Sequence, residues 1–139
     1  MIATVVMHAR ARAGWVVYGA ALAVVLLITL MPSLVRLTSG QVPLGCSWAL
    51  YPGLSEERVL NVLLFVPLGA ACVLAPRRGL AVVVALAAPF VIESAQAVLP
   101  LGRVCDVTDL VTNLTGLLVG LALGLLVVAI AHLGRRLRS

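Results

Sequence analysis

The sequence predicts an all-α integral membrane protein with four transmembrane helices and with both termini on the cytoplasmic side. Its 139 residues are 63% hydrophobic and only 11% charged, and its mean hydropathy of +1.18 is far above that of soluble domains. The apolar residues also form four long runs separated by short polar segments. We therefore expect residues 1–139 to form a single membrane domain.

Each apolar run is predicted to be a helix. A hydrocarbon core of about 30 Å requires about 20 apolar residues in a helix that rises about 1.5 Å per residue. Lipid cannot satisfy bare backbone groups, and the runs lack the alternation typical of barrel strands. The predicted spans are residues 14–35, 59–75, 79–99 and 110–133. The first is longer than the core of a signal peptide, so we expect it to be retained.

The arginines predict the orientation, because cytoplasmic segments next to spans carry an excess of positive charge. With the N-terminus inside, seven of the ten arginines lie on the cytoplasmic side, and Arg36, Arg58 and Arg103 lie outside. The chain contains no lysine and no basic stripe interleaved with aromatic residues, so a nucleic-acid partner is not expected. The net charge of +5 is explained by topology instead.

The second helix has a clear start signal. Ser55 can accept hydrogen bonds from the first backbone amides, and Glu56 and Glu57 complement the positive end of the helix. Capping is therefore a sufficient explanation for the two glutamates. Just before this start, Trp48 and Tyr51 have amphipathic rings that favour the membrane surface.

Polar side chains gather at the outer ends of the last three helices. Glu93 is the one ionisable residue that lies inside a span whichever boundaries are chosen, roughly 9 Å from the outer end. Such a residue costs about 2.5–3.5 kcal/mol at the bilayer centre and requires an explanation. The predicted polar cluster comprises Asn61, Glu93, Gln96, Arg103, Asp106, Asp109 and Asn113.

The fourth helix combines this cluster with a packing face. Asp106, Asp109 and Asn113 lie at offsets of three and seven, which places them on one face. Glycines continue the same stripe at intervals of four and would let another helix approach closely, so the stripe is expected to face protein. The residues assigned to helix packing are Pro67, Gly69, Gly116, Gly120 and Gly124.

The cluster has two interpretations. In the first, the groups hydrogen-bond to one another, with Arg103 paired to Asp106 or Glu93, and so fix the packing of the helices. Alternatively the cluster is a binding pocket, because three acids against one nearby arginine leave negative charge without a partner unless a ligand, a metal ion or protonation accounts for it.

Three cysteines occur, and their spacing matches no zinc-binding pattern. In the predicted topology Cys46 and Cys105 both lie outside, where an oxidising environment permits a disulfide bond between them. Two free thiols are the alternative.

The polar and small residues, taken in order across three helices, resemble the VanZ-like family of small bacterial membrane proteins. The resemblance covers residues 61–124 and rests on Asn61-x3-Phe65-x-Pro67-x-Gly69, on Glu93-x2-Gln96 and on Arg103-x2-Asp106-x2-Asp109-x3-Asn113-x2-Gly116-x3-Gly120. It implies a multi-pass protein of the bacterial cytoplasmic membrane, in a family associated with resistance to the glycopeptide antibiotic teicoplanin. This association describes a phenotype and not a reaction.

Two functions remain open. The first is an outward-facing polar pocket that binds an envelope lipid or another amphiphile, with Arg103 holding an anionic group such as a phosphate. The second is an enzyme that acts on a lipid-linked phosphate, with a carboxylate-bound divalent cation such as Mg²⁺ or with Glu93 as a general base. No nucleophile elbow and no HExxH motif is present, so no catalytic residue and no cofactor is assigned. A monomeric channel is disfavoured, because the inner halves of the spans carry almost no polar groups.

Overall fold

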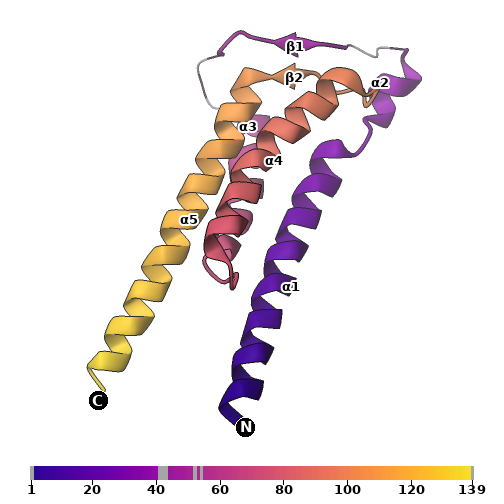
Figure 1. Cartoon of the computed structure of the whole chain (residues 1–139). Coiled ribbons are helices and arrows are strands. Elements are labelled where there is room, and N and C mark those ends of the chain that lie inside the picture. The colour runs from indigo at the N-terminus through magenta and orange to yellow at the C-terminus, as the bar shows by residue number, and fades with distance from the viewer. Residues whose placement is uncertain (1, 41–43, 52, 54, 139) are drawn as a thin grey trace.

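The computed structural model describes residues 2–40, 44–51, 53 and 55–138. Its long helices, which run side by side, are α1 (Ile2–Leu30), α3 (Glu56–Cys72), α4 (Arg78–Val98) and α5 (Val107–Arg136) (Figure 1). A short helix, α2 (Leu34–Thr38), and two short strands, β1 (Cys46–Ser47) and β2 (Cys105–Asp106), lie together at one end of the bundle. We call this the bridge end. Both ends of the chain lie at the opposite end (Figure 1).

The helices have the length and composition of a membrane protein. In the part of the chain that the structure describes, three stretches are long and apolar enough to cross a bilayer: Ala11–Thr38, Arg78–Val98 and Val107–Arg136. Helix α3 has 17 residues, at the short limit of the lengths that span a bilayer, and is not among them. The mostly helical, membrane-type architecture is thus confirmed, whereas the count of four spans and the orientation of the termini stay predictions.

The first helix differs most from its predicted range of 14–35. Helix α1 begins near the start of the chain and ends at Leu30, and the chain becomes helical again only at Leu34. Pro32 explains the break, because a proline disfavours helical backbone at the preceding residue and has no amide to donate. The other three helices begin and end within three residues of their predicted ranges.

The α1–α2 junction is fastened to the bridge end. The backbone amide of Ser33 donates to the carbonyl of Leu101, between α4 and β2, at 2.8 Å. A side chain at Gly102 would lie 3.1 Å from the Cβ of Arg36. The two connections therefore lie against each other, although some 70 residues of sequence separate them.

Helices α3 and α5 form the most extensive contact in the bundle. A Cβ added at Gly116 or Gly120 would overlap backbone carbonyl groups of α3, and one added at Gly69 would overlap backbone of α5. Gly124 is less tight, with the carbonyl oxygen of Ala70 3.0 Å from an added Cβ. Pro67 is exposed and lines an apolar pocket of about 280 Å³ between α1, α3 and α5.

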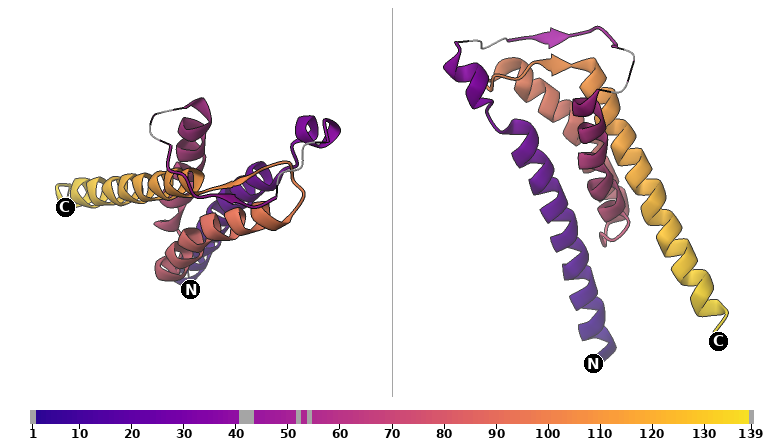
Figure 2. Two further views of the ribbon diagram at one scale, coloured as in Figure 1. Left: turned by 90° about the horizontal axis from the view of Figure 1, so that it is seen from above. Right: turned by 180° about the vertical axis from the view of Figure 1, so that it is seen from behind.

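The core lies where the four long helices meet, and its largest buried side chains are Val25, Phe65, Leu68, Ile92 and Leu117. Helix α1 is also tied to α4 by a buried hydrogen bond, in which the Tyr18 hydroxyl donates to the carbonyl of Ala81 at 3.0 Å. The α3–α4 hairpin ends well short of the chain termini, so it covers the half of the bundle nearest the bridge end (Figure 2).

Candidate functional site

A strap of chain, residues 44–51, crosses the bridge end of the bundle (Figure 2). Its strand β1 pairs in parallel with β2, so that Cys46 lies beside Cys105 and Ser47 beside Asp106. The two cysteines are joined by a disulfide bond with an S–S distance of 2.04 Å. These two-residue strands are local exceptions to the predicted all-α architecture.

Hydrogen bonds hold both ends of the strap. At one end the backbone amide of Gly45 donates to the carbonyl of Ala97, near the end of α4, at 3.1 Å. At the other end the Tyr51 amide donates to Oγ1 of Thr108 at 3.3 Å, and that hydroxyl donates to the carbonyl of Ala49 at 3.2 Å. The strap is thus fixed to α4 and to the first turn of α5.

A cavity of about 500 Å³ lies at the bridge end. Its walls come from α1, α2, α3, α4, the α4–β2 connection and the start of α5. Five residues of the predicted polar cluster line it: Asn61, Gln96, Arg103, Asp106 and Asp109. The structure therefore brings most of the cluster, from three helices and a loop, to one hollow.

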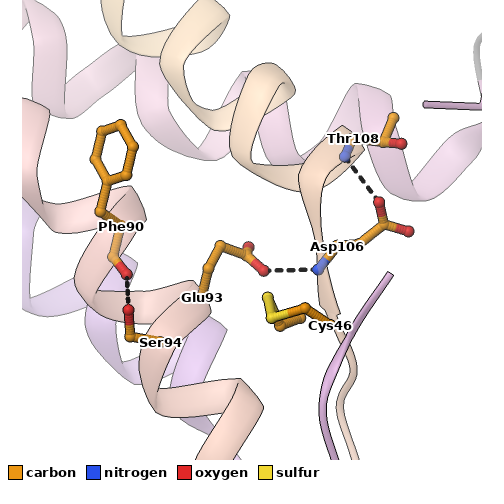
Figure 3. The surroundings of a disulfide bond; sticks show 7 residues. Cys46, Phe90, Glu93, Ser94, Asp106 and Thr108 are labelled. Atoms are coloured by element: carbon orange, nitrogen blue, oxygen red, sulfur yellow. Dashed lines mark hydrogen bonds between the residues drawn. A yellow bond between two sulfur atoms is a disulfide. The ribbon is translucent and has the colours of Figure 1, made fainter. Parts of the chain in front are cut away.

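The remaining two members of the cluster lie outside the cavity lining. Glu93 is 6% exposed, and its Oε2 accepts a hydrogen bond from the backbone amide of Asp106 at 2.8 Å (Figure 3). Its carboxylate therefore joins α4 to β2, beside Cys46 of the disulfide (Figure 3). Asn113 is 2% exposed, and its Oδ1 has no hydrogen-bond partner among the described residues.

Two residues of the cavity wall also form hydrogen bonds that stabilise the fold. Asp106 is the N-cap of α5, where its Oδ1 accepts from the amide of Thr108 at 2.7 Å. This fits the preference for aspartate at a helix start. Gln96 is buried, and its Nε2 donates to the carbonyl of Thr29 at 2.9 Å, which ties α4 to the last turn of α1.

Arg103 is exposed, and its Nε donates a hydrogen bond to the carbonyl of Met31 at 3.3 Å. Within the described residues it forms no ion pair within 4.0 Å with Asp106 or Glu93. The pairing expected for a purely structural network is therefore not the arrangement found. The terminal amino groups of the guanidinium have no protein partner in the described part of the chain.

Seven residues that sequence reasoning did not place in the cluster also line the cavity: Ile28, Ser33, Arg36, Glu57, Leu60, Gly102 and Val104. Glu57 was explained by capping alone, yet it lies four residues before Asn61 and so shares a helix face with it. This spacing could have placed Glu57 in the predicted cluster. Arg36 offers no such signal, because its position depends on the break at Pro32 and on contact with Gly102.

Among the described residues, no three His, Cys, Asp or Glu side chains are grouped so that they could hold a metal ion. The cavity lining combines carboxylate, amide and guanidinium groups.

Comparison with known families shows which family the chain belongs to. The model of the VanZ/LLP1 family matches residues 15–128, which includes all four long helices in large part, the strap and every polar residue of the cavity. The chain belongs to the VanZ/LLP1 family. The resemblance inferred from the ordered motif is thereby confirmed, and the match also covers α1 and the strap, where no motif had been recognised. No curated protein and no solved structure matches the chain.

Membership of the VanZ/LLP1 family agrees with the helices that are long and apolar enough to cross a membrane. The family is one that is associated with glycopeptide resistance, as the resemblance implied.

Proposed function

We propose that this VanZ/LLP1 protein binds an envelope amphiphile by holding its polar head group in the cavity at the bridge end. One observation carries the proposal: apolar helices end in a hollow of about 500 Å³ whose wall contains arginine, carboxylate and amide side chains. Ligand sites combine such a concavity with a few convergent polar groups.

Arg103 is the residue that we assign to an anionic group of the ligand. Its Nε is anchored on Met31, which positions the planar guanidinium at the cavity wall. A guanidinium matches the geometry of phosphate and carboxylate oxygens and remains charged at any physiological pH. Arg36 also lines the cavity and supplies a second cation there.

The apolar edge of the cavity favours a ligand that is itself in the membrane. Ile28 of α1 and Leu60 of α3 line the cavity and are 49% and 57% exposed, respectively. An amphiphile would place its head group among the polar residues and its acyl chains against such side chains. In a bacterial cell we assign the protein to the cytoplasmic membrane, with the bridge end facing outward and both termini in the cytoplasm.

The test is lipid binding by the full-length protein purified in detergent, measured by native mass spectrometry with an anionic phospholipid. Replacing Arg103 by Gln should weaken binding about tenfold or more, because a charge-assisted hydrogen bond is lost. Arg77→Gln, in the exposed α3–α4 turn, is the matched control and should leave binding unchanged. Equal binding by wild type and both variants would contradict the proposal.

A cellular measurement addresses the family phenotype. Expression of the wild type in a teicoplanin-sensitive bacterium should raise the minimal inhibitory concentration, and the Arg103→Gln protein, present in the membrane at the same level, should not. If the variant protects as well as the wild type does, the cavity is not the source of the resistance.

A further inference from the structure

The charged residues of the cavity wall are divided by sign. Arg36 and Arg103 lie on neighbouring segments, because the α1–α2 junction is hydrogen-bonded to the α4–β2 connection from Ser33 to Leu101 and packs closely against Gly102. We call these two arginines the cationic wall. They come from α2 and from the connection that precedes β2.

The carboxylates gather elsewhere, at the starts of α3 and α5. Glu57 belongs to the first turn of α3, Asp106 caps α5, and Asp109 belongs to the first turn of α5. Asp109 is repelled electrostatically by both of the other carboxylates, is attracted by Arg58 and accepts a hydrogen bond from the side-chain amide of Asn61. We call these three acids the anionic wall; all three line the same cavity as the arginines.

The two walls do not neutralise each other. Within the described residues, neither arginine of the cationic wall lies within 4.0 Å of a carboxylate of the anionic wall. Arg36, Arg103 and Glu57 are exposed, so a ligand in the cavity can reach the charges of both walls. A molecule with a positive and a negative group at its two ends would satisfy both walls together.

We infer that the cavity takes a zwitterionic head group, with a primary ammonium group against Glu57 and Asp109 and a phosphate against Arg36 and Arg103. This inference rests on the proposed function and names the chemical class of its ligand: a phospholipid whose phosphate is esterified with an aminoalkyl alcohol. An ammonium group has three donors and no acceptor, so it suits a wall of carboxylates, whereas a quaternary amine of equal charge cannot donate. The exposed Ile28 and Leu60 at the cavity edge place the source of the head group in the bilayer.

The test compares four phospholipids with identical acyl chains and the full-length protein in detergent: phosphatidylethanolamine, phosphatidylcholine, phosphatidylglycerol and phosphatidic acid. Wild-type protein should bind phosphatidylethanolamine about tenfold more tightly than phosphatidylcholine, as expected for the loss of charge-assisted hydrogen bonds. It should also prefer phosphatidylethanolamine to phosphatidylglycerol, since the anionic wall repels additional negative charge and offers no partner to a glycerol head group.

Glu57→Gln is the decisive variant, because Glu57 is exposed and its replacement leaves the core intact. It should abolish the preference for phosphatidylethanolamine over phosphatidylcholine while binding to phosphatidylglycerol stays equal or rises. Glu56→Gln, the adjacent exposed glutamate that does not line the cavity, should retain the wild-type preference. Asp109→Asn provides an independent second variant for the same wall.

The outcomes separate this inference from the proposed function. If all four lipids bind equally and Arg103→Gln weakens all four, the cavity binds lipid phosphate and the zwitterion inference is overturned. If no lipid depends on Arg103, the proposed function fails as well. If free phosphoethanolamine binds as tightly as the lipid, the ammonium and phosphate chemistry is supported, but the bilayer is excluded as the source.

Discussion

The close approach of α3 and α5 predicts that a single methyl group at Gly120 destabilises the protein. A Cβ at this position would lie 2.8 Å from the carbonyl carbon and 2.9 Å from the Cα of Val66. Carbon atoms in favourable contact are about 3.5–4.0 Å apart, so the two helices would have to separate by roughly 0.7 Å or more. The obstacle is backbone, which no side-chain rotation can move aside.

The magnitude follows from two opposing terms. Overpacking of this kind typically costs about 1–3 kcal/mol. Alanine is intrinsically about 1 kcal/mol better than glycine within a helix, which offsets part of the cost. Gly19→Ala is the matched control, because an added Cβ there has no neighbour within 4 Å and receives the same helical advantage. The difference in unfolding free energy between the two variants should therefore be about 1–3 kcal/mol, with Gly120→Ala the less stable.

The assay is reversible unfolding in mixed micelles with increasing sodium dodecyl sulfate, followed by far-ultraviolet circular dichroism. Gly19→Ala should be as stable as the wild type or slightly more stable. The separation should also disturb the cavity, since Asn61 on α3 and Asp109 on α5 both line it. Equal stability of the two alanine variants would refute the conclusion that α3 and α5 meet backbone to backbone at Gly120.

Three further predictions concern the strap, the buried carboxylate and the topology. Reduction of the Cys46–Cys105 disulfide, which closes a separation of 59 residues, should lower stability by up to about 4 kcal/mol on the chain-entropy estimate, and no shift in the unfolding midpoint with reductant would contradict it. Glu93→Leu should cost about 1–3 kcal/mol in the same unfolding assay because the amide of Asp106 loses its acceptor, whereas Glu93→Gln should cost less; equal losses would show that this hydrogen bond is not responsible. Cysteines introduced one at a time near each terminus should react with a thiol label from one side of the membrane, and a cysteine that replaces Trp48 should react from the other. Reaction of all three from one side would exclude the predicted orientation.

Much of the helical architecture is predictable because lipid imposes a strong constraint on the backbone. A run of apolar residues in a bilayer must satisfy its amides and carbonyls internally, so the three later runs predicted helices to within three residues at each end. The first run was less predictable. Its apolar composition continues past Leu30, and hydropathy alone does not register that Pro32 ends the helix there.

The site was predictable where helical periodicity brings residues together. Asp106 caps α5 and Asp109 lies in its first turn, while Asn61 and Gln96 occur near the bridge ends of α3 and α4, so their meeting in one cavity follows from their positions along the helices. Glu93 was placed at the right end of α4, yet its carboxylate turns to the backbone of β2 and not into the cavity. Whether the carboxylate faces the cavity or the backbone of β2 depends on distances in the folded structure, which the spacing of residues along the sequence does not give.

The sequence by itself determined the membrane character, the family and most of the polar residues that line the cavity, because hydropathy, helical period and an ordered motif are properties of the chain alone. Only the tertiary structure decided that Arg36 joins Arg103 on one wall and Glu57 joins Asp109 on the other. Those pairings depend on the break after α1 and on how the helices pack. The physical reason is that contacts between residues far apart in the sequence are set by packing in three dimensions, and hydropathy or helical spacing within one segment does not contain that information.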